Sequence, residues 1–231
     1  EIGVRLVGSE MCIRDREEIN MAGGPGSYVI GEEEKKELMD VITSGNLFRY
    51  GTPGVDGFQA KVATFEKEMA ERLGHRYIVA TNSGTSALLC CLAALNIGAG
   101  DEVIVPGYTF IATISTVILS NAIPVLAEID DSLTIDPTKI EQLITPRTKA
   151  IIPVHMLGNP CDMDPIMEIA RKHNLHVIED CCQAVGASYK GKRVGSIGDM
   201  GAYSLNVYKT ISTGDGGFVG TSDAVSSTHL T

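Results

Sequence analysis

The stretch YIVATNSGTSALLCCLAALNIGAGDEVIVP, residues 77–106, decides the fold class of this chain of 231 residues. It begins with a β-rich run, Tyr77–Ala80, and passes through a glycine-containing turn into an apolar helical segment, Ser86–Leu95. It ends in a second β-rich run, Glu102–Pro106. Apolar strands that alternate with helices are typical of a parallel sheet covered by helices on both faces. The sequence therefore predicts an α/β protein with a mostly parallel central sheet.

The same alternation extends to both sides of this stretch. Two amphipathic helices are predicted upstream, one from Gly31 and one ended by Gly74, with a glycine-rich loop at 46–59 between them. Downstream, Asp164 is predicted to cap a helix that has Pro165 at its first position. The other predicted strands are Ile123–Ile129, Ala150–Val154, His176–Glu179, Met200–Leu205 and Gly217–Gly220, and the other predicted helices are Ile111–Leu119, Pro137–Leu143 and Pro165–Lys172.

The composition argues against several classes of function. With 19 basic and 29 acidic residues the net charge is −10, and no basic patch for a nucleic-acid backbone is visible. No apolar stretch approaches the roughly 20 residues that cross a bilayer, and we find no secretory signal. The six cysteines lack C-x-x-C or Cys/His spacing, so we expect free thiols, a reducing cytoplasm and no metal site.

Both ends of the chain look foreign to the fold. The run Glu10–Arg16 resembles the translation of a common sequencing-library adapter, and Ala224–Thr231 resembles its reverse complement in another frame. We therefore interpret 1–16 and 224–231 as adapter-derived tails and 17–223 as the folded part. The alternative is two ordinary termini, and resequencing of the source DNA decides between them.

Ligands of a parallel sheet collect at the carboxyl ends of its strands, so the residues after each strand are the candidates for a site. A turn at Gly84 opens the helix that follows the first strand, with Thr85 and Ser86 in its first turn. Free backbone N–H groups and hydroxyl groups at a helix N-terminus suit an anion such as a phosphate. The alternative is a plain N-cap turn.

Two further residues point to the same kind of ligand. Asp180 ends a strand, and a buried carboxylate needs a cationic or hydrogen-bonding partner, such as a protonated pyridine nitrogen, unless it only caps the next turn. Lys209 follows apolar and aromatic residues and precedes a glycine-rich loop, whereas most lysines are solvated. An amine shielded from water can attack a carbonyl carbon. Pyridoxal phosphate requires all three features: a phosphate site, an acid and a lysine.

These motifs resemble one known family, the DegT/DnrJ/EryC1/StrS aminotransferases. The resemblance runs in order from about Tyr28 to Asp223. It rests on Ser83–Leu88, Gly100–Pro106, Tyr108–Phe110, Ala112-Thr113, Glu179-Asp180, Gln183-Ala184, Gly198-Asp199 and Lys209–Gly217.

The resemblance implies a role for each matching residue. Lys209 would bind pyridoxal 5′-phosphate as a Schiff base and then move a proton between the amino donor and the cofactor. Asp180 would keep the ring nitrogen protonated, Gln183 would contact the ring hydroxyl and Phe110 would stack on the ring. The phosphate would be bound by Gly84, Thr85, Ser86 and Ser204.

The resemblance also implies the large domain of a type I pyridoxal-phosphate transferase. Members act as cytoplasmic homodimers that move an amino group from glutamate or glutamine to a keto sugar, typically on a nucleotide carrier. This chain differs in Leu205, where an aromatic residue is usual, and in Cys181, where alanine is usual. It also ends soon after Lys209, so the small C-terminal domain is expected to be missing, and activity of this chain alone does not follow from the resemblance.

Other functions remain to be weighed. Leu47–Tyr50 and Val154–Met156 resemble a branch with an aminotransferase for an eight-carbon keto-sugar acid, in which Arg49 would meet a carboxylate and His155 would line the site. Arg49 as a loop surface residue and His155 as a hydrogen-bonded core residue are the alternatives. Lys209 argues against a dehydratase of the family, and the retained site residues argue against a non-catalytic binding homologue. A nicotinamide dehydrogenase would need a G-x-G-x-x-G turn after its first strand, and we find no such turn.

Overall fold

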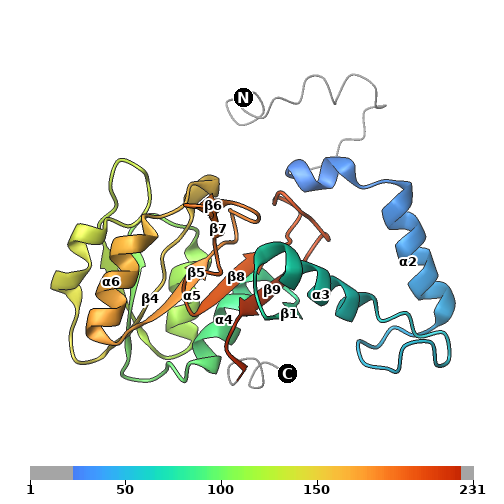
Figure 1. Cartoon of the computed structure of the whole chain (residues 1–231), viewed down its shortest axis with the longest axis horizontal. Helices are drawn as coiled ribbons and strands as arrows, with labels where there is room; N and C mark the ends of the chain where they lie inside the picture. Colours follow the sequence, from blue (N-terminus) through green and yellow to red (C-terminus); the bar gives the residue numbers. More distant parts are fainter. Residues whose placement is uncertain (1–22, 225–231) are drawn as a thin grey trace.

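The computed structural model describes residues 23–224 (Figure 1). The expected adapter-derived tails lie outside the described residues, apart from Ala224. Seven strands form one sheet in the order β1-β9-β8-β5-β4-β2-β3. Only β9 runs against its neighbours, so the predicted mostly parallel sheet is confirmed. The strands are β1 (Tyr77–Thr81), β2 (Glu102–Pro106), β3 (Ile123–Ala127), β4 (Thr148–Ile151), β5 (His176–Asp180), β8 (Met200–Ser204) and β9 (Gly217–Thr221), and a separate hairpin pairs β6 (Ser188–Tyr189) with β7 (Lys192–Arg193).

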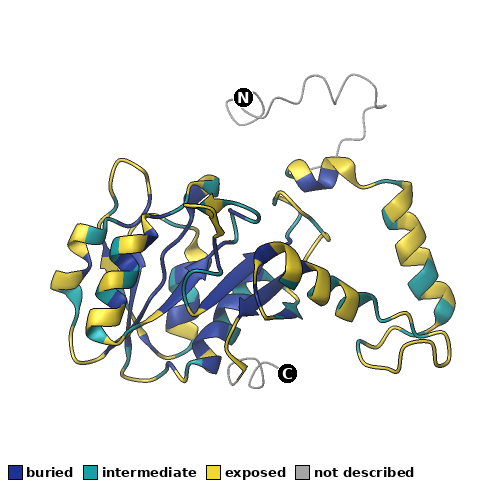
Figure 2. Cartoon of the chain, viewed as in Figure 1, coloured by how far each residue is buried: buried dark blue, intermediate teal, exposed yellow. Residues whose placement is uncertain are grey.

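The centre of the sheet is buried, whereas the N-terminal helix is not. All residues of β2, β8 and β9 are buried, which explains why these strands lack a regular alternation of apolar and polar residues (Figure 2). Helix α2 (Glu32–Ser44) has no buried residue and lies apart from the sheet, joined to it through the loop that precedes α3 (Lys61–Leu73). The sheet and its covering helices therefore form the core that positions a site.

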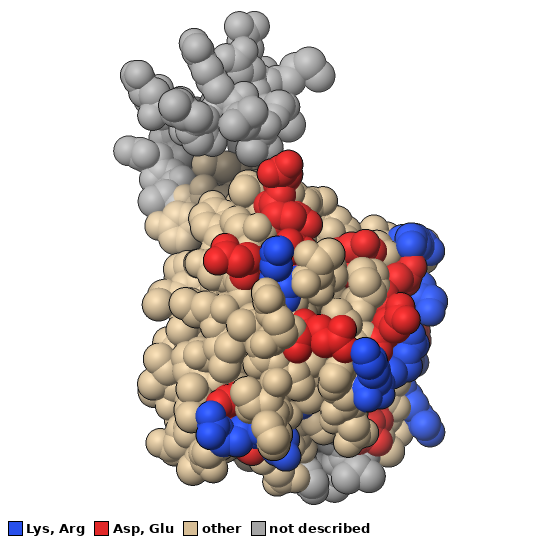
Figure 3. Space-filling view, turned by 90° about the vertical axis from the view of Figure 1, so that its left-hand side faces the viewer, with Lys and Arg blue, Asp and Glu red and all other residues tan. Residues whose placement is uncertain are grey.

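The surface carries charge of both signs. On the face shown in Figure 3, acidic and basic side chains lie next to one another rather than in separate fields. Exposed ion pairs include Lys172 with Glu141 and Lys190 with Asp164. Across residues 23–224, no helix is long and apolar enough to cross a membrane.

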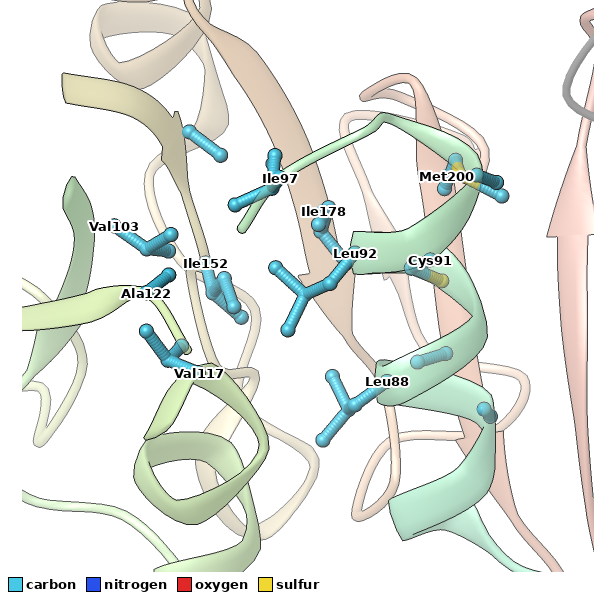
Figure 4. Close-up of a cluster of buried hydrophobic side chains, with 14 of the residues drawn as sticks. Leu88, Cys91, Leu92, Ile97, Val103, Val117, Ala122, Ile152, Ile178 and Met200 are labelled. Carbon is cyan, nitrogen blue, oxygen red and sulfur yellow. The ribbon is translucent and has the colours of Figure 1, made fainter. Parts of the chain in front are cut away.

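Helices cover both faces of the sheet. On one face, α4 (Gly84–Ala94) and α5 (Ile111–Leu119) pack Leu88, Leu92 and Val117 against the strands (Figure 4). On the other face, α6 (Met163–His173) packs Ile166 against the strands, and α3 packs Leu73. Successive strand residues point to opposite faces, as in β5, where Val177 joins one core and Ile178 the other. Cys181 and Leu205, the two departures from the family pattern, are both buried in the core under α3.

The structure corrects several expected boundaries; the strand predicted at Ile123–Ile129, for example, ends at Ala127. The helix predicted at Pro137–Leu143 is two short 3₁₀ turns, η2 (Pro137–Lys139) and η3 (Glu141–Leu143), because so short a segment cannot support a cooperative α-helix. Helix α6 begins at Met163, so Asp162 is its N-cap and the expected cap, Asp164, lies in its first turn. The strand predicted at Ala150–Val154 begins and ends earlier, because a 3₁₀ turn, η4 (Met156–Gly158), follows soon after it.

Candidate active site

The carboxyl ends of the parallel strands meet at one edge of the sheet. The turn between β1 and α4, the end of β8 and the start of β9 touch there. A Cβ atom at Gly84 would lie 2.8 Å from both Cys182 Sγ and Ser204 Cβ, and one at Gly217 would lie 2.5 Å from the carbonyl group of Ser83. Only glycine fits at contacts this close. The expected phosphate-binding turn therefore packs directly against Ser204 and Cys182.

Asp180 lies at this edge with only 4% of its surface exposed. Its Oδ2 accepts a hydrogen bond of 2.8 Å from the Thr113 hydroxyl group, and its Oδ1 accepts one of 3.1 Å from the Cys182 backbone N–H. The second bond is the turn cap that we weighed as the alternative role. No ion pair within residues 23–224 includes Asp180, so its buried negative charge lacks a cationic partner there. A protonated ring nitrogen would supply one.

The first turn of α4 combines an N-cap with donors that remain available. Ser83 Oγ accepts a bond of 3.0 Å from the Ser86 N–H and lies 3.0 Å from the Ser86 hydroxyl oxygen, so Ser83 is the N-cap. The side chain of Thr85 has no hydrogen-bond partner in the described part of the chain. Ser204 is 5% exposed, and its Oγ accepts a bond of 3.3 Å from the Asn206 N–H. Hydroxyl groups of this kind beside the first turn of a helix suit a phosphate.

Lys209 lies in the loop between β8 and β9 and is partly buried. Burial and the neighbouring Asp180 carboxylate raise the pKa of the Cys182 thiol well above its usual value, and the Lys209 ammonium group acts in the opposite direction. The charge of Lys209 is therefore within electrostatic range of Cys182, which directly contacts the Gly84 turn. The loop that carries Lys209 leaves β8 at the same edge, since β8 runs parallel to β5, which ends at Asp180.

Phe110 and Gln183 occupy the rim of the same edge. Phe110 precedes α5 as its N-cap residue, and 64% of its surface is exposed, so its ring is available to a ligand. The Gln183 amide is already engaged: its Oε1 accepts a bond of 3.2 Å from the Leu157 N–H, and its Nε2 lies 3.5 Å from the Met156 sulfur. Contact of Gln183 with a ring hydroxyl would have to share or replace these bonds.

The two residues expected to meet a substrate lie near this edge, but their side chains are engaged within the protein. The Arg49 guanidinium group forms an ion pair with Glu66 and donates a bond of 3.1 Å to the Ala80 carbonyl oxygen, so it is not a simple surface residue. His155 is fully buried, with Nδ1 accepting from the Cys161 N–H at 3.1 Å and Nε2 lying 3.0 Å from Glu179. With both ring nitrogens occupied, the structure favours the core alternative for His155 over contact with a substrate.

Glu179, whose role no local pattern indicates, organises the hydrogen bonds on the opposite side of β5. Its two carboxylate oxygens accept four hydrogen bonds, and its surface is 0% exposed. Potential ligand atoms of His155, Glu179 and Cys181 lie within 4.8 Å of one another, but the carboxylate oxygens already have two donors each. The cluster therefore serves hydrogen bonding. The donors are His155 Nε2 and the backbone N–H groups of Gly195, Ile197 and Gly198.

Thr113 is the second residue whose role the sequence did not reveal. It is 1% exposed, and Thr109 lies 2.8 Å away, between the hydroxyl oxygens of the two side chains. The family motif included it, but nothing local indicates that its hydroxyl group reaches Asp180. The resulting arrangement fits pyridoxal phosphate: donors for a phosphate, a buried acid for a ring nitrogen and a partly buried amine for an aldehyde.

Comparisons with known proteins agree with this arrangement. The profile of the DegT/DnrJ/EryC1/StrS aminotransferase family matches residues 29–230. GDP-perosamine synthase of Caulobacter vibrioides is 51% identical over 163 residues, which cover 70% of this chain and 44% of that protein. UDP-N-acetyl-3-dehydro-α-D-glucosamine 3-aminotransferase of Acidithiobacillus ferrooxidans is 52% identical over 163 residues, covering 69% and 44%.

A solved structure supports the fold. The aminotransferase of Psychrobacter cryohalolentis matches with a TM-score of 0.81 and 43% identity, covering 87% of this chain and 50% of that one. The match confirms the fold class expected from the resemblance. This chain spans about half the length of the curated relatives that it matches.

Proposed function

The chain belongs to the DegT/DnrJ/EryC1/StrS aminotransferase family, and from this premise we propose that the protein transfers an amino group to a keto sugar with pyridoxal 5′-phosphate bound to Lys209. The observation that carries the proposal is the buried Asp180 carboxylate, which has no cationic partner among residues 23–224. It lies at the same edge as the Gly84 turn and Lys209.

In this proposal each residue at the carboxyl edge of the sheet has a separate role. Lys209 would hold the cofactor through its aldehyde and, once the amine of the donor has displaced it, would move a proton at Cα of the amino donor. Asp180 holds the proton on the ring nitrogen, while Thr113 fixes the carboxylate through its hydrogen bond. When bound, pyridoxal phosphate supplies an electron sink for the negative charge at Cα. Phe110 covers the ring, and Gln183 contacts its hydroxyl group.

The phosphate is held at the start of α4 in this proposal. The helix dipole and the free N–H groups of its first turn favour an anion there. The side chain of Thr85 is available, and the approach of Ser204 to Gly84 brings a third hydroxyl group to the same place. We assign the phosphate to Gly84, Thr85, Ser86 and Ser204.

The substrate that we propose is a nucleotide-linked keto sugar, with glutamate or glutamine as amino donor. Two relatives support this choice, since their names specify a GDP-linked and a UDP-linked sugar. The alternative, a keto-sugar acid, would use Arg49 for the carboxylate. That guanidinium group is paired with Glu66, which favours the nucleotide sugar.

We further propose that residues 17–223 are the cofactor-binding large domain of a cytoplasmic homodimer. Helix α2 and the loop after it support the dimer, because large apolar side chains are exposed there. Leu38 is 64% exposed, Leu47 76% and Phe48 71%. A second copy that covers these side chains would remove their apolar surface from water.

Absorbance spectroscopy tests the central claim. The 231-residue chain mixed with pyridoxal phosphate should develop a visible-range Schiff-base band, and Lys209→Ala should abolish it. Lys149→Ala is the matched control, because Lys149 is an exposed residue of β4. Borohydride reduction followed by peptide mass spectrometry should map the cofactor to Lys209. A band that persists in Lys209→Ala would overturn the proposal. The absence of a band in the parent chain would also overturn it and would favour a non-catalytic homologue.

A further inference from the structure

The N-terminal segment Gly23–Ser27 packs against the loop that carries Lys209. We define residues 205–216 as the lysine loop and Gly23–Ser27 as the glycine segment. The Gly24 N–H donates a hydrogen bond of 2.8 Å to the Val207 carbonyl oxygen, and the Gly26 N–H donates one of 3.0 Å to the carbonyl oxygen of Lys209 itself. Alternate amides of one segment thus bind alternate carbonyls of the other, one at Lys209 itself and one two residues before it. The glycine segment and the lysine loop lie close to each other in Figure 1.

The two glycines are needed for a steric reason. A Cβ atom at Gly24 would lie 2.2 Å from the Tyr208 carbonyl oxygen, and one at Gly26 would lie 2.7 Å from the Thr210 carbonyl oxygen. Both obstacles are backbone atoms, which cannot rotate away as a side chain can. Gly24 has a φ of −90°, so its backbone conformation alone would accept another residue. The close approach to the lysine loop therefore explains the glycine at this position.

At its base, the lysine loop is closed by its own backbone hydrogen bonds and does not need the glycine segment. The Leu205 N–H bonds the Gly216 carbonyl oxygen at 2.8 Å, and the Thr213 N–H bonds the Leu205 carbonyl oxygen at 2.9 Å. At the tip, the Lys209 N–H bonds only within the loop, to the Asn206 carbonyl oxygen at 2.9 Å. Over the described ranges, the two bonds from the glycine segment are the backbone bonds that connect the tip to another part of the protein.

We propose that the glycine segment is a positioning element that fixes the Lys209 backbone relative to Asp180. The inference rests on the proposed role of Lys209 and adds a part of the chain that precedes residue 29, where the family match begins. Misplacement of a reacting group by about 1 Å can cost roughly a hundredfold in rate. A segment that holds the Lys209 carbonyl group in place would therefore control how fast the amine captures an aldehyde.

Two measurements on Gly24→Ala test the inference. Without cofactor, amide hydrogen exchange at Lys209 should become about tenfold faster or more, because the tip opens more often, while exchange in β8 stays unchanged. With pyridoxal phosphate, the visible band should appear about ten- to a hundredfold more slowly. The control is Gly98→Ala, where a Cβ atom meets its nearest neighbour, the Ser120 carbonyl oxygen, at an ordinary 3.6 Å.

The outcomes separate this inference from the proposed function. If Gly24→Ala exchanges and captures cofactor like the parent chain, the glycine segment has no positioning role, even though the band still depends on Lys209. If the parent chain forms no band, the proposed function fails and hydrogen exchange alone decides. Should Gly24→Ala not fold, Ser27→Ala replaces it, because the Ser27 hydroxyl group donates a bond of 2.7 Å to the Gly24 carbonyl oxygen. Ser27→Ala should loosen the tip in the same direction, and exchange equal to that of the parent would contradict the inference.

Discussion

Replacing Glu179 with glutamine tests whether this buried carboxylate holds the loop at residues 195–198, which precedes β8. Its Oε1 accepts bonds of 2.7 Å from the N–H groups of Ile197 and Gly198. Its Oε2 accepts one of 2.7 Å from the Gly195 N–H and lies 3.0 Å from His155 Nε2. Since His155 Nδ1 accepts a bond from Cys161, Nε2 must carry the proton, so all four partners are donors.

A glutamine cannot satisfy four donors. Whichever way its amide group turns, the NH₂ group faces two N–H donors and two hydrogen bonds are lost. At about 1 to 3 kcal/mol for each buried donor without a partner, Glu179→Gln should cost about 2 to 6 kcal/mol. This is a large share of the roughly 5 to 15 kcal/mol that stabilises a domain.

Urea unfolding followed by circular dichroism measures this cost. The matched control is Glu128→Gln, because Glu128 is an exposed residue just after β3. The control should change the free energy of unfolding by less than about 0.5 kcal/mol. A loss below about 1 kcal/mol for Glu179→Gln would refute the reasoning, since it would mean that the loop does not depend on the charge of the acceptor.

Two further predictions concern buried polar groups. Burial lowers the pKa of His75 from its ordinary 6.5 to about 4, so the unfolded chain takes up this proton first as the pH falls. This contribution to the free energy of unfolding, on the order of 2 to 3 kcal/mol, is therefore present above about pH 6.5 and lost toward pH 4. From pH 7.5 to pH 4.5, the free energy of unfolding should fall less for His75→Gln than for the parent chain. Equal falls would contradict the lowered pKa of His75. Thr113→Val removes the hydroxyl donor to Asp180. Because a bond to a charged group contributes about 1.5 to 3 kcal/mol, this variant should need about tenfold more pyridoxal phosphate, or more, for half-maximal band formation. The control is Thr116→Val, since Thr116 is a buried neighbour bonded to its own helix, and equal half-maximal concentrations for Thr113→Val and the parent would contradict the prediction.

The sequence predicted elements well where local pattern decides them. The bounds of β2 and α5 agree with the expected runs Glu102–Pro106 and Ile111–Leu119, since an apolar run and a helical period are both encoded within a few residues. The sequence did not predict which strands are neighbours. The stretch that decided the fold class contains β1 and β2, yet β9, β8, β5 and β4 lie between them. Strand order depends on contacts between distant segments, which a local pattern does not record.

The candidate site shows the same limit. The rule that ligands collect at the carboxyl ends of strands selected Gly84 and Asp180, the family resemblance added Ser204, and the structure places Gly84 against Ser204 at one edge. Their partners were not predictable. Thr113 is 67 residues from Asp180 in sequence, and Arg49 reaches Glu66 across 17 residues. Each partnership depends on the tertiary packing of separate elements, and the residue types alone allow many others.

The adjacent acids of β5 show how one strand can separate a structural role from a ligand-binding one. Glu179 and Asp180 point to opposite faces, because side chains alternate along a strand. Four donors occupy the Glu179 oxygens, whereas Asp180 has two donors for its two oxygens and so retains capacity for a further partner. A slip of one residue would exchange the two carboxylates. Pairing of Ile178 with Met200 and of Asp180 with Ala202 fixes the register, so the β5–β8 ladder determines which acid is left to meet a cation.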